Sequence, residues 1–169
     1  MKGSYQNIIL LTSRKAIHMF QKILAPIDGS KPAHDAFVNA LQMAKIHGSD
    51  VEILHVMTFT EDAPHVPRNP GDDTPDSWID DYMSRVRRKD EKMLSDAVEE
   101  AKAAGLSGKV TSRLLIGKPG DAIIAEASEG GFNLIVIGDR GLGGLKELLL
   151  GSVSHQVVNE STIPVLVVK

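Results

Sequence analysis

The sequence predicts an α/β protein with a doubly wound, five-stranded parallel sheet in the Rossmann-like strand order 3-2-1-4-5 and helices on both faces. Short apolar segments alternate strictly with longer amphipathic ones, which is typical of strands joined by crossover helices. Two short segments, "LIVI" at residues 134–137 and "VLVV" at residues 165–168, are apolar at every position, as strands buried on both faces are. Right-handed crossovers then leave few possible topologies.

The first strand and helix carry clear boundary signals. The segment "KILAPI" predicts a strand, and apolar residues at helical spacing predict a helix between Ser30 and Gly48. Ser30 is a good N-cap, Pro32 suits the first turn, and Gly48 suits the end of a helix. The segment "VEILHVM" predicts the second strand. Residues 58–77 are rich in Pro, Asp and Gly and predict a surface loop.

The second half of the sequence continues the alternation. A long amphipathic helix is predicted at residues 77–104, followed by the strand "KVTSRLLI", the helix "PGDAIIAEASE", the strand "NLIVIG", the helix "SVSHQVVNES" and the strand "PVLVVK". The last strand is apolar, lies at the sheet edge and has no helix after it, so we expect it to pair with a second copy. The pattern begins only after Met19. We therefore expect residues 1–18 to be an extension outside the fold and residues 19–169 to be one domain.

Composition excludes several classes of protein. A chain of 169 residues with 42% hydrophobic and 24% charged residues is typical of one soluble globular domain. The formal net charge of −3 argues against a general nucleic-acid binder. No segment has the roughly 20 apolar residues of a membrane span, and the N-terminus lacks the apolar stretch of a signal peptide. Without cysteine there is no disulfide or cysteine metal site, which fits a reducing cytoplasm.

The segment "GDRGLGGLKELLLGS" places three glycines, Gly138, Gly141 and Gly151, around the end of the fourth strand and the start of the last helix. Ligands of parallel sheets bind beyond the carboxyl ends of the strands, where this segment lies. Bare backbone and the free N–H groups of a helix N-terminus would suit phosphate oxygens. The P-loop pattern is absent, and GxGxxG fails because Lys146 stands where the third glycine belongs. Ordinary turn and cap glycines are the alternative.

The whole spacing, GxxG, nine residues and then G[ST], resembles the ATP-binding signature of the universal stress protein family. The resemblance covers about residues 20–169 and includes "KILAPIDGS", "VEILHVM", "GKPGDAI" and "STIPVLVVK". It implies ATP, with or without Mg²⁺, as the ligand, and a homodimer joined through the last strand. It also implies that Pro26 and Asp28 line the adenosine pocket and that Val56 contacts adenine through its backbone. The ribose and phosphates would be held by Gly138, Gly141, Gly151, Ser152, Val153 and Ser154.

Asp139 departs from this resemblance, because many family members have an uncharged residue there. A carboxylate would repel phosphates unless it points outward or holds a metal ion, and the neighbouring Arg140 could offset its charge. Among the histidines, His55 lies inside an apolar strand and is expected to be a buried core residue with its polar groups satisfied. The others are scattered without the pairing of a zinc site.

The leading functional hypothesis is an ATP-binding, cytoplasmic stress-response protein that acts as a nucleotide-dependent regulatory or binding module on an unknown protein partner. A slow ATPase or phosphotransferase is the alternative. Phosphoryl transfer needs metal-holding carboxylates and a group that places the nucleophile, and only Asp28 and Asp139 are near the site. No catalytic or metal-binding residue is therefore assigned. A phospho-receiver is rejected because the third strand ends in "LLIGKPG" without an acceptor Asp.

Overall fold

The computed structural model describes residues 20–58, 76–142 and 150–169. These residues form β1 Lys22–Pro26, α1 Lys31–His47, β2 Asp50–Met57, α2 Asp76–Ala103, β3 Val110–Ile116, α3 Pro119–Glu129, β4 Leu134–Gly138, α4 Ser152–Glu160 and β5 Val165–Val168. The predicted order of strands and helices is confirmed. The extension predicted at residues 1–18 and nearly all of the loop predicted at residues 58–77 lie outside the described residues.

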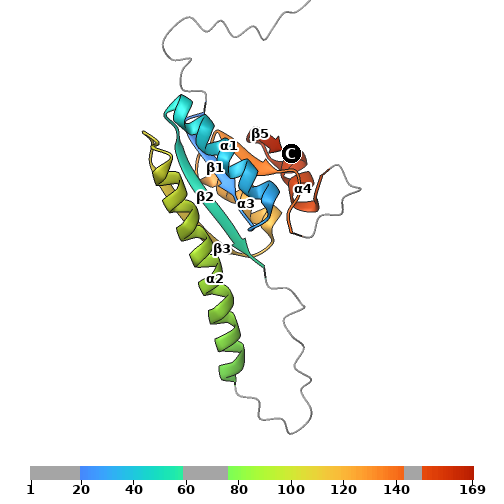
Figure 1. Cartoon of the computed structure of the whole chain (residues 1–169). Helices are drawn as coiled ribbons and strands as arrows, with labels where there is room; N and C mark the ends of the chain where they lie inside the picture. Colours follow the sequence, from blue (N-terminus) through green and yellow to red (C-terminus); the bar gives the residue numbers. More distant parts are fainter. Residues whose placement is uncertain (1–19, 59–75, 143–149) are drawn as a thin grey trace, which may run out of the picture.

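The strands form a parallel, five-stranded sheet in the order β3-β2-β1-β4-β5, as predicted (Figure 1). β1 lies in the middle, with Leu24 beside Glu52 of β2 on one side and beside Ile135 of β4 on the other. The chain leaves β1 toward β2 and later returns to its other side as β4. The carboxyl ends of β1 and β4 therefore flank the switch point of strand order, where a crevice is expected.

Two hydrophobic clusters cover the two faces of the sheet. The first joins strand residues such as Ile23 to Phe37 of α1 and Leu94 of α2. The second joins strand residues such as Leu24 to α3 and to Val157 of α4. Because both faces are covered, β1 and β4 are buried along nearly their whole length, which explains why their sequences lack the alternation of a half-exposed strand.

The last strand differs from its sequence-based prediction. β5 was expected to be buried on both faces like β4, but it is only partly buried, and Leu166 is 37% exposed. Among the described strands, β5 pairs with β4 alone and occupies the edge of the sheet. The apolar side chains of β5 are therefore not fully buried by the other described residues.

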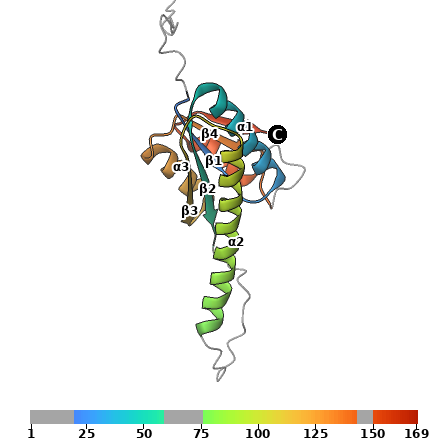
Figure 2. The same cartoon turned by 60° about the vertical axis from the view of Figure 1, so that its left-hand side comes forward.

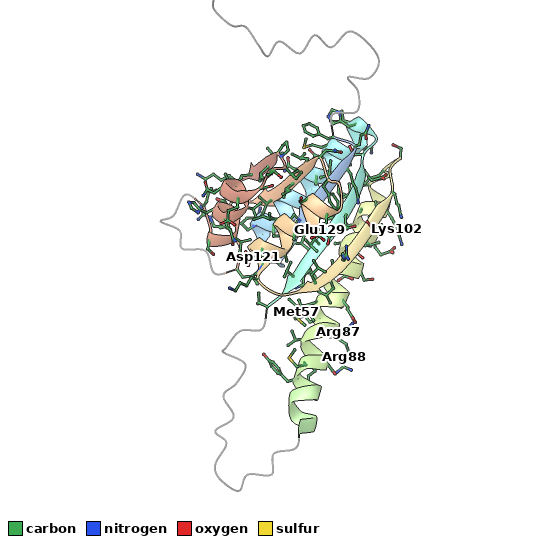
Figure 3. The ribbon with its side chains drawn as sticks, turned by 180° about the vertical axis from the view of Figure 1, so that it is seen from behind. Met57, Arg87, Arg88, Lys102, Asp121 and Glu129 are labelled. Atoms are coloured by element: carbon green, nitrogen blue, oxygen red, sulfur yellow. The ribbon has the colours of Figure 1, made fainter. Side chains whose placement is uncertain are left out.

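Helix α2 is longer than the sheet it covers. Its carboxyl-terminal part packs on the core through Leu94, Ala97 and Ala101, which are buried. Its amino-terminal part projects past the carboxyl edge of the sheet (Figures 1 and 2). Figure 3 shows Arg87 and Arg88 on this projecting part, beyond Met57 at the end of β2. This projecting part of α2, called the overhanging part below, places one side of the helix beside the sheet edge at which a ligand is expected.

Candidate functional site

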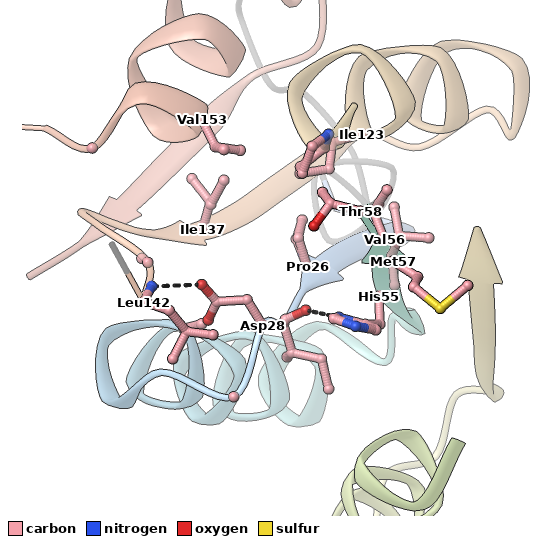
Figure 4. A pocket seen from close by; sticks show the side chains of 18 of the residues that line it. Pro26, Asp28, His55, Val56, Met57, Thr58, Ile123, Ile137, Leu142 and Val153 are labelled. Atoms are coloured by element: carbon pink, nitrogen blue, oxygen red, sulfur yellow. Dashed lines mark hydrogen bonds between the residues drawn. The ribbon is translucent and has the colours of Figure 1, made fainter. Parts of the chain in front are cut away.

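A cavity of about 680 Å³ opens at the carboxyl edge of the sheet, where β1, β2 and β4 end (Figure 4). Its size lies in the usual range for small-molecule sites. Its walls come from the turn between β1 and α1, the end of β2, the overhanging part of α2, the start of α3 and the β4–α4 segment. The cavity therefore occupies the position that the strand order predicts.

All the residues that the sequence assigned to ligand binding line this one cavity. They are Pro26, Asp28, Val56, Gly138, Gly141, Gly151, Ser152, Val153 and Ser154. Figure 4 shows Asp28 across from Leu142, with Pro26 and Val56 toward the β2 side and Val153 toward α4. The structure thus brings together residues from four separate segments of the sequence.

The Asp28 carboxylate bridges two of these segments. Oδ1 accepts a hydrogen bond from the backbone N–H of Ser30 at 2.9 Å, and Oδ2 accepts one from the backbone N–H of Leu142 at 3.1 Å (Figure 4). A Cβ atom on Gly141 would lie only 2.3 Å from Asp28 Oδ2. The absence of a side chain at Gly141 therefore lets the carboxylate reach the β4–α4 segment.

Gly138 has a different reason to be glycine. A Cβ atom there would lie 2.7 Å from the backbone C and O atoms of Pro32 and 2.9 Å from the N atom of Ala33. Those atoms belong to the first turn of α1, so the close approach at Gly138 is to another helix. Gly138, Gly141 and Gly151 all have φ values outside the positive range, and so none is required by a left-handed conformation.

Ser154 also has a partner within the protein. It is 3% exposed, and its Oγ donates a hydrogen bond of 2.7 Å to the carbonyl oxygen of Gly138. A hydroxyl has one hydrogen to donate, so this bond uses the donor that the resemblance would offer to a phosphate. The side chain of Ser154 ties the start of α4 to the end of β4.

The start of α4 leaves backbone donors available. Gly151 is the N-cap and offers no side chain to cap the helix, and the first helical bond runs from the N–H of His155 to the Gly151 carbonyl at 2.9 Å. The N–H groups of Ser152, Val153 and Ser154 therefore have no acceptor within the helix. Together with the helix dipole, they make this end of the cavity suited to an anion.

The Asp139 carboxylate does not line this end of the cavity, although it lies directly behind Arg140. Asp139 is only 4% exposed and is not among the residues lining the cavity, whereas Arg140 is. Oδ2 of Asp139 accepts hydrogen bonds from Nε and Nη2 of Arg140, at 3.1 and 2.9 Å. The pairing with Arg140 that the sequence suggested is therefore present, and the carboxylate lies behind the guanidinium.

One wall of the cavity was missed by the sequence reasoning. It comes from the overhanging part of α2 and comprises Val86, Lys89, Asp90 and Met93.

His55 was expected to be a buried histidine whose polar groups have hydrogen-bond partners, and this is confirmed. It is 8% exposed, and its Nδ1 forms a 2.8 Å hydrogen bond with the Ile27 carbonyl. Its Nε2 lies 3.4 Å from Asp90 Oδ2, which connects β2 to α2.

Within residues 20–58, 76–142 and 150–169, no three His, Cys, Asp or Glu side chains lie close enough together to hold a metal ion. No helix in these same segments is long and apolar enough to cross a membrane.

The fold defines a doubly wound α/β protein, with a cavity at its topological switch point. The chain belongs to the universal stress protein family, whose model matches residues 19–169. It is 36% identical to the universal stress protein YxiE of Bacillus subtilis, an alignment that covers 89% of this chain and 100% of that protein. Universal stress protein MJ0577 of Methanocaldococcus jannaschii is 28% identical, with 89% and 96% covered.

Solved structures of universal stress proteins also resemble this chain. The structure of MJ0577 superposes with a TM-score of 0.72 at 27% identity, covering 89% of this chain and 96% of that one. A universal stress protein crystallised in complex with cAMP superposes with a TM-score of 0.64 at 25% identity, covering 88% and 96%.

Proposed function

We propose that this protein binds an adenine nucleotide, ATP in particular, in the cavity at the carboxyl edge of the sheet, and acts as a nucleotide-dependent regulatory or binding module in the cytoplasm. The observation that carries this proposal is the convergence of the whole glycine signature and Asp28 on one cavity of about 680 Å³. The related structure with cAMP supports an adenine nucleotide as the class of ligand.

The two ends of the cavity suit the two ends of such a ligand. Near Val56, Pro119 and Ile123 the wall is apolar and would accept the flat adenine ring. At the other end, the free N–H groups at the start of α4 would face the phosphates. Asp28 lies at the turn after β1, and its oxygens keep lone pairs that could accept hydrogen bonds from ribose hydroxyls.

The described residues do not supply a protein site for Mg²⁺. Both oxygens of Asp28 accept backbone hydrogen bonds, and Asp139 is paired with Arg140 behind the cavity wall. Mg²⁺ commonly keeps several waters and binds through substrate phosphates. An Mg²⁺ ion accompanying ATP would therefore be held by the phosphate oxygens and water.

Calorimetry with ATP is expected to show saturable binding, and mass spectrometry of freshly purified, denatured protein should reveal a bound adenine nucleotide. Asp28→Asn should weaken ATP binding by about 10-fold. The amide has one acceptor oxygen fewer and no negative charge, so its hydrogen bonds to the ribose hydroxyls would be weaker. Asp35→Asn is the matched control, because Asp35 lies on the surface of α1, paired with Lys31. It should leave ATP affinity unchanged.

Two results would contradict the proposal. Absence of saturable binding by the wild-type protein at millimolar ATP would remove the nucleotide site. Turnover of ATP at about 1 per second or faster would favour the alternative function, a phosphotransferase or ATPase.

We further propose that two copies pair through β5. Leu166 of β5 is 37% exposed, and Val158 of α4, the helix that packs beside β5, is 41% exposed. An apolar strand at a sheet edge is prone to pair with another strand, and a two-fold axis closes such a pair. The backbone N–H of Asp139 donates a 2.7 Å hydrogen bond to the Val168 carbonyl. The proposed interface is thereby linked directly to the phosphate end of the cavity.

The double variant Leu166→Asp and Val158→Asp is expected to be a monomer in sedimentation equilibrium at micromolar concentration. The carboxylates would be buried without partners in the paired form, while both positions are already open to solvent in the single chain. Ile46→Asp is the control, because Ile46 is 76% exposed near the end of α1, and it should leave a dimer. A monomeric wild-type protein, or a double variant that remains dimeric, would rule out this interface.

A further inference from the structure

Arg140 lines the cavity near the start of α4, and its guanidinium is paired with a buried carboxylate. Nε and Nη2 of Arg140 both donate to the same oxygen of Asp139, at 3.1 and 2.9 Å. The arginine side chain is 23% exposed and lines the cavity. An arginine has five N–H donors, so this pairing leaves three of them available. None of these three N–H groups donates a hydrogen bond to another described residue.

The carboxylate that holds the guanidinium is itself held on both sides. The N–H of Asp139 donates to the Val168 carbonyl at 2.7 Å, and the Asp139 carbonyl accepts from the N–H of Gly151 at 2.7 Å. The Asp139 side chain is only 6% exposed. Its backbone is thus tied to β5 and to the start of α4, and the buried carboxylate has little freedom to move.

Gly151 explains how Arg140 comes to lie at the start of α4. A Cβ atom on Gly151 would be 3.0 Å from Cα and 3.4 Å from Cβ of Arg140. Without that atom, Arg140 can pass directly against the N-cap of α4. Arg140 therefore borders the same end of the cavity as Ser152 and Val153, whose N–H groups have no acceptor within α4.

We propose that Arg140, positioned by Asp139, is the residue through which this cavity selects ligands carrying a phosphate chain over the uncharged nucleoside. This inference rests on the nucleotide-binding function proposed above. The planar guanidinium matches phosphate geometry, and its charge-assisted hydrogen bonds are roughly twice as strong as neutral ones. The ion pair presents its positive member to the cavity and keeps its negative member behind the wall, so its local field favours an anion.

Lys89, which also lines the cavity among the described residues, is less suited to this role. Lys89 belongs to α2, which covers the opposite face of the sheet from α4. Its neighbour Asp90 also lines the cavity and carries a negative charge at that wall. A phosphate chain at the start of α4 would meet Arg140 rather than Lys89.

The proposal is tested by measuring ATP and adenosine affinities of the full-length protein by calorimetry. Arg140→Gln is expected to weaken ATP binding about 10- to 100-fold and to change adenosine binding less than about twofold. Arg140→Lys should recover only part of the loss, because an ammonium group cannot make the paired contact of Nε and Nη2. Arg113→Gln is the matched control: Arg113 pairs with Glu126 on the surface, and its loss should leave both affinities unchanged.

The positioning role of Asp139 needs a readout that a purely structural role would not give. Asp139→Ala removes a negative charge close to the phosphates, yet we expect it to weaken ATP binding, because the guanidinium is no longer held. In the Arg140→Gln background the same substitution should have no effect or should improve ATP binding. If Asp139→Ala fails to fold, as judged by its melting transition, Asp139→Asn takes its place in this double-mutant cycle.

The outcomes separate this inference from the proposed function. Wild-type protein that binds ATP while Arg140→Gln binds it equally well, or loses ATP and adenosine binding to the same extent, overturns the role of Arg140 alone. Higher ATP affinity in Asp139→Ala overturns the positioning role, since the carboxylate would then act only by repulsion. Wild-type protein that binds no adenine nucleotide overturns the proposed function and this inference with it.

Discussion

Gly138→Val should destabilise the fold by at least about 3 kcal/mol, and not merely weaken ligand binding. The first added atom would lie 2.7 Å from the backbone C and O atoms of Pro32. These atoms sit in the first turn of α1, which is anchored in the core by Phe37 and cannot shift without disturbing it. Overpacking by even small groups commonly costs about 1–3 kcal/mol, and valine adds three carbons.

The free energy of unfolding in urea measures this effect. Gly105→Ala provides the comparison, because Gly105 has a φ of +68° and no atom within 4 Å of the added Cβ. That variant reports conformational strain without a steric contact and should cost about 1 kcal/mol. A Gly138→Val protein as stable as the wild type but unable to bind ATP would mean that glycine is required at position 138 by the ligand and not by packing against α1.

Gly138 also shows how far the sequence could be used to predict the site. The sequence placed Gly138 at the end of the fourth strand, which is confirmed, and Gly138 lines the cavity; its role in holding a nucleotide stays a prediction. It could not reveal that the backbone of Pro32, distant in sequence, approaches this glycine. Local sequence patterns predict periodicity and turns, whereas glycine is required at position 138 because of a tertiary contact. The hydroxyl of Ser154 is a second case, because its acceptor is the Gly138 carbonyl.

The fold was easier to predict because each element carries its own signals. Ser30 caps α1 by accepting a hydrogen bond from the N–H of Ala33, and Gly48 ends it in the left-handed conformation, with φ at 68°. Both boundaries follow from residue type alone. The partial exposure of β5 does not, since its apolar sequence is the same whether the strand is covered by its own chain or by another.

The α2 wall was missed for a related reason. Val86 and Met93 belong to the amphipathic helix predicted at residues 77–104, and a pattern of this kind normally marks the face that packs on the core. They line the cavity because α2 extends beyond the sheet edge, and that extension depends on how the helix is placed against β2 and β3. Helical spacing predicts which face of a helix is apolar, but not whether core or cavity lies beneath each turn.

Gly141→Val is expected to lower ATP affinity by at least about 100-fold, or about 2.7 kcal/mol, while the protein stays folded. The contact is closer than at Gly138, with 2.3 Å between the added Cβ and Asp28 Oδ2, but the neighbour is a side-chain carboxylate that can rotate away. Rotation would break the 3.1 Å hydrogen bond from the Leu142 N–H and turn the negative charge elsewhere in the cavity. The variant should therefore lose the ligand and retain its unfolding free energy to within about 1 kcal/mol.

The role of Asp28 in this effect can be isolated by a double-mutant cycle. In an Asp28→Ala background the carboxylate is gone, so the added side chain at position 141 has no charge to displace. Gly141→Val should then cost clearly less in ATP affinity than it does in the wild-type background. Equal costs in the two backgrounds would show that the valine blocks the ligand directly and that the contact between Asp28 and the β4–α4 segment is incidental. A loss of unfolding free energy as large as that expected for Gly138→Val would show instead that Gly141 is required for packing.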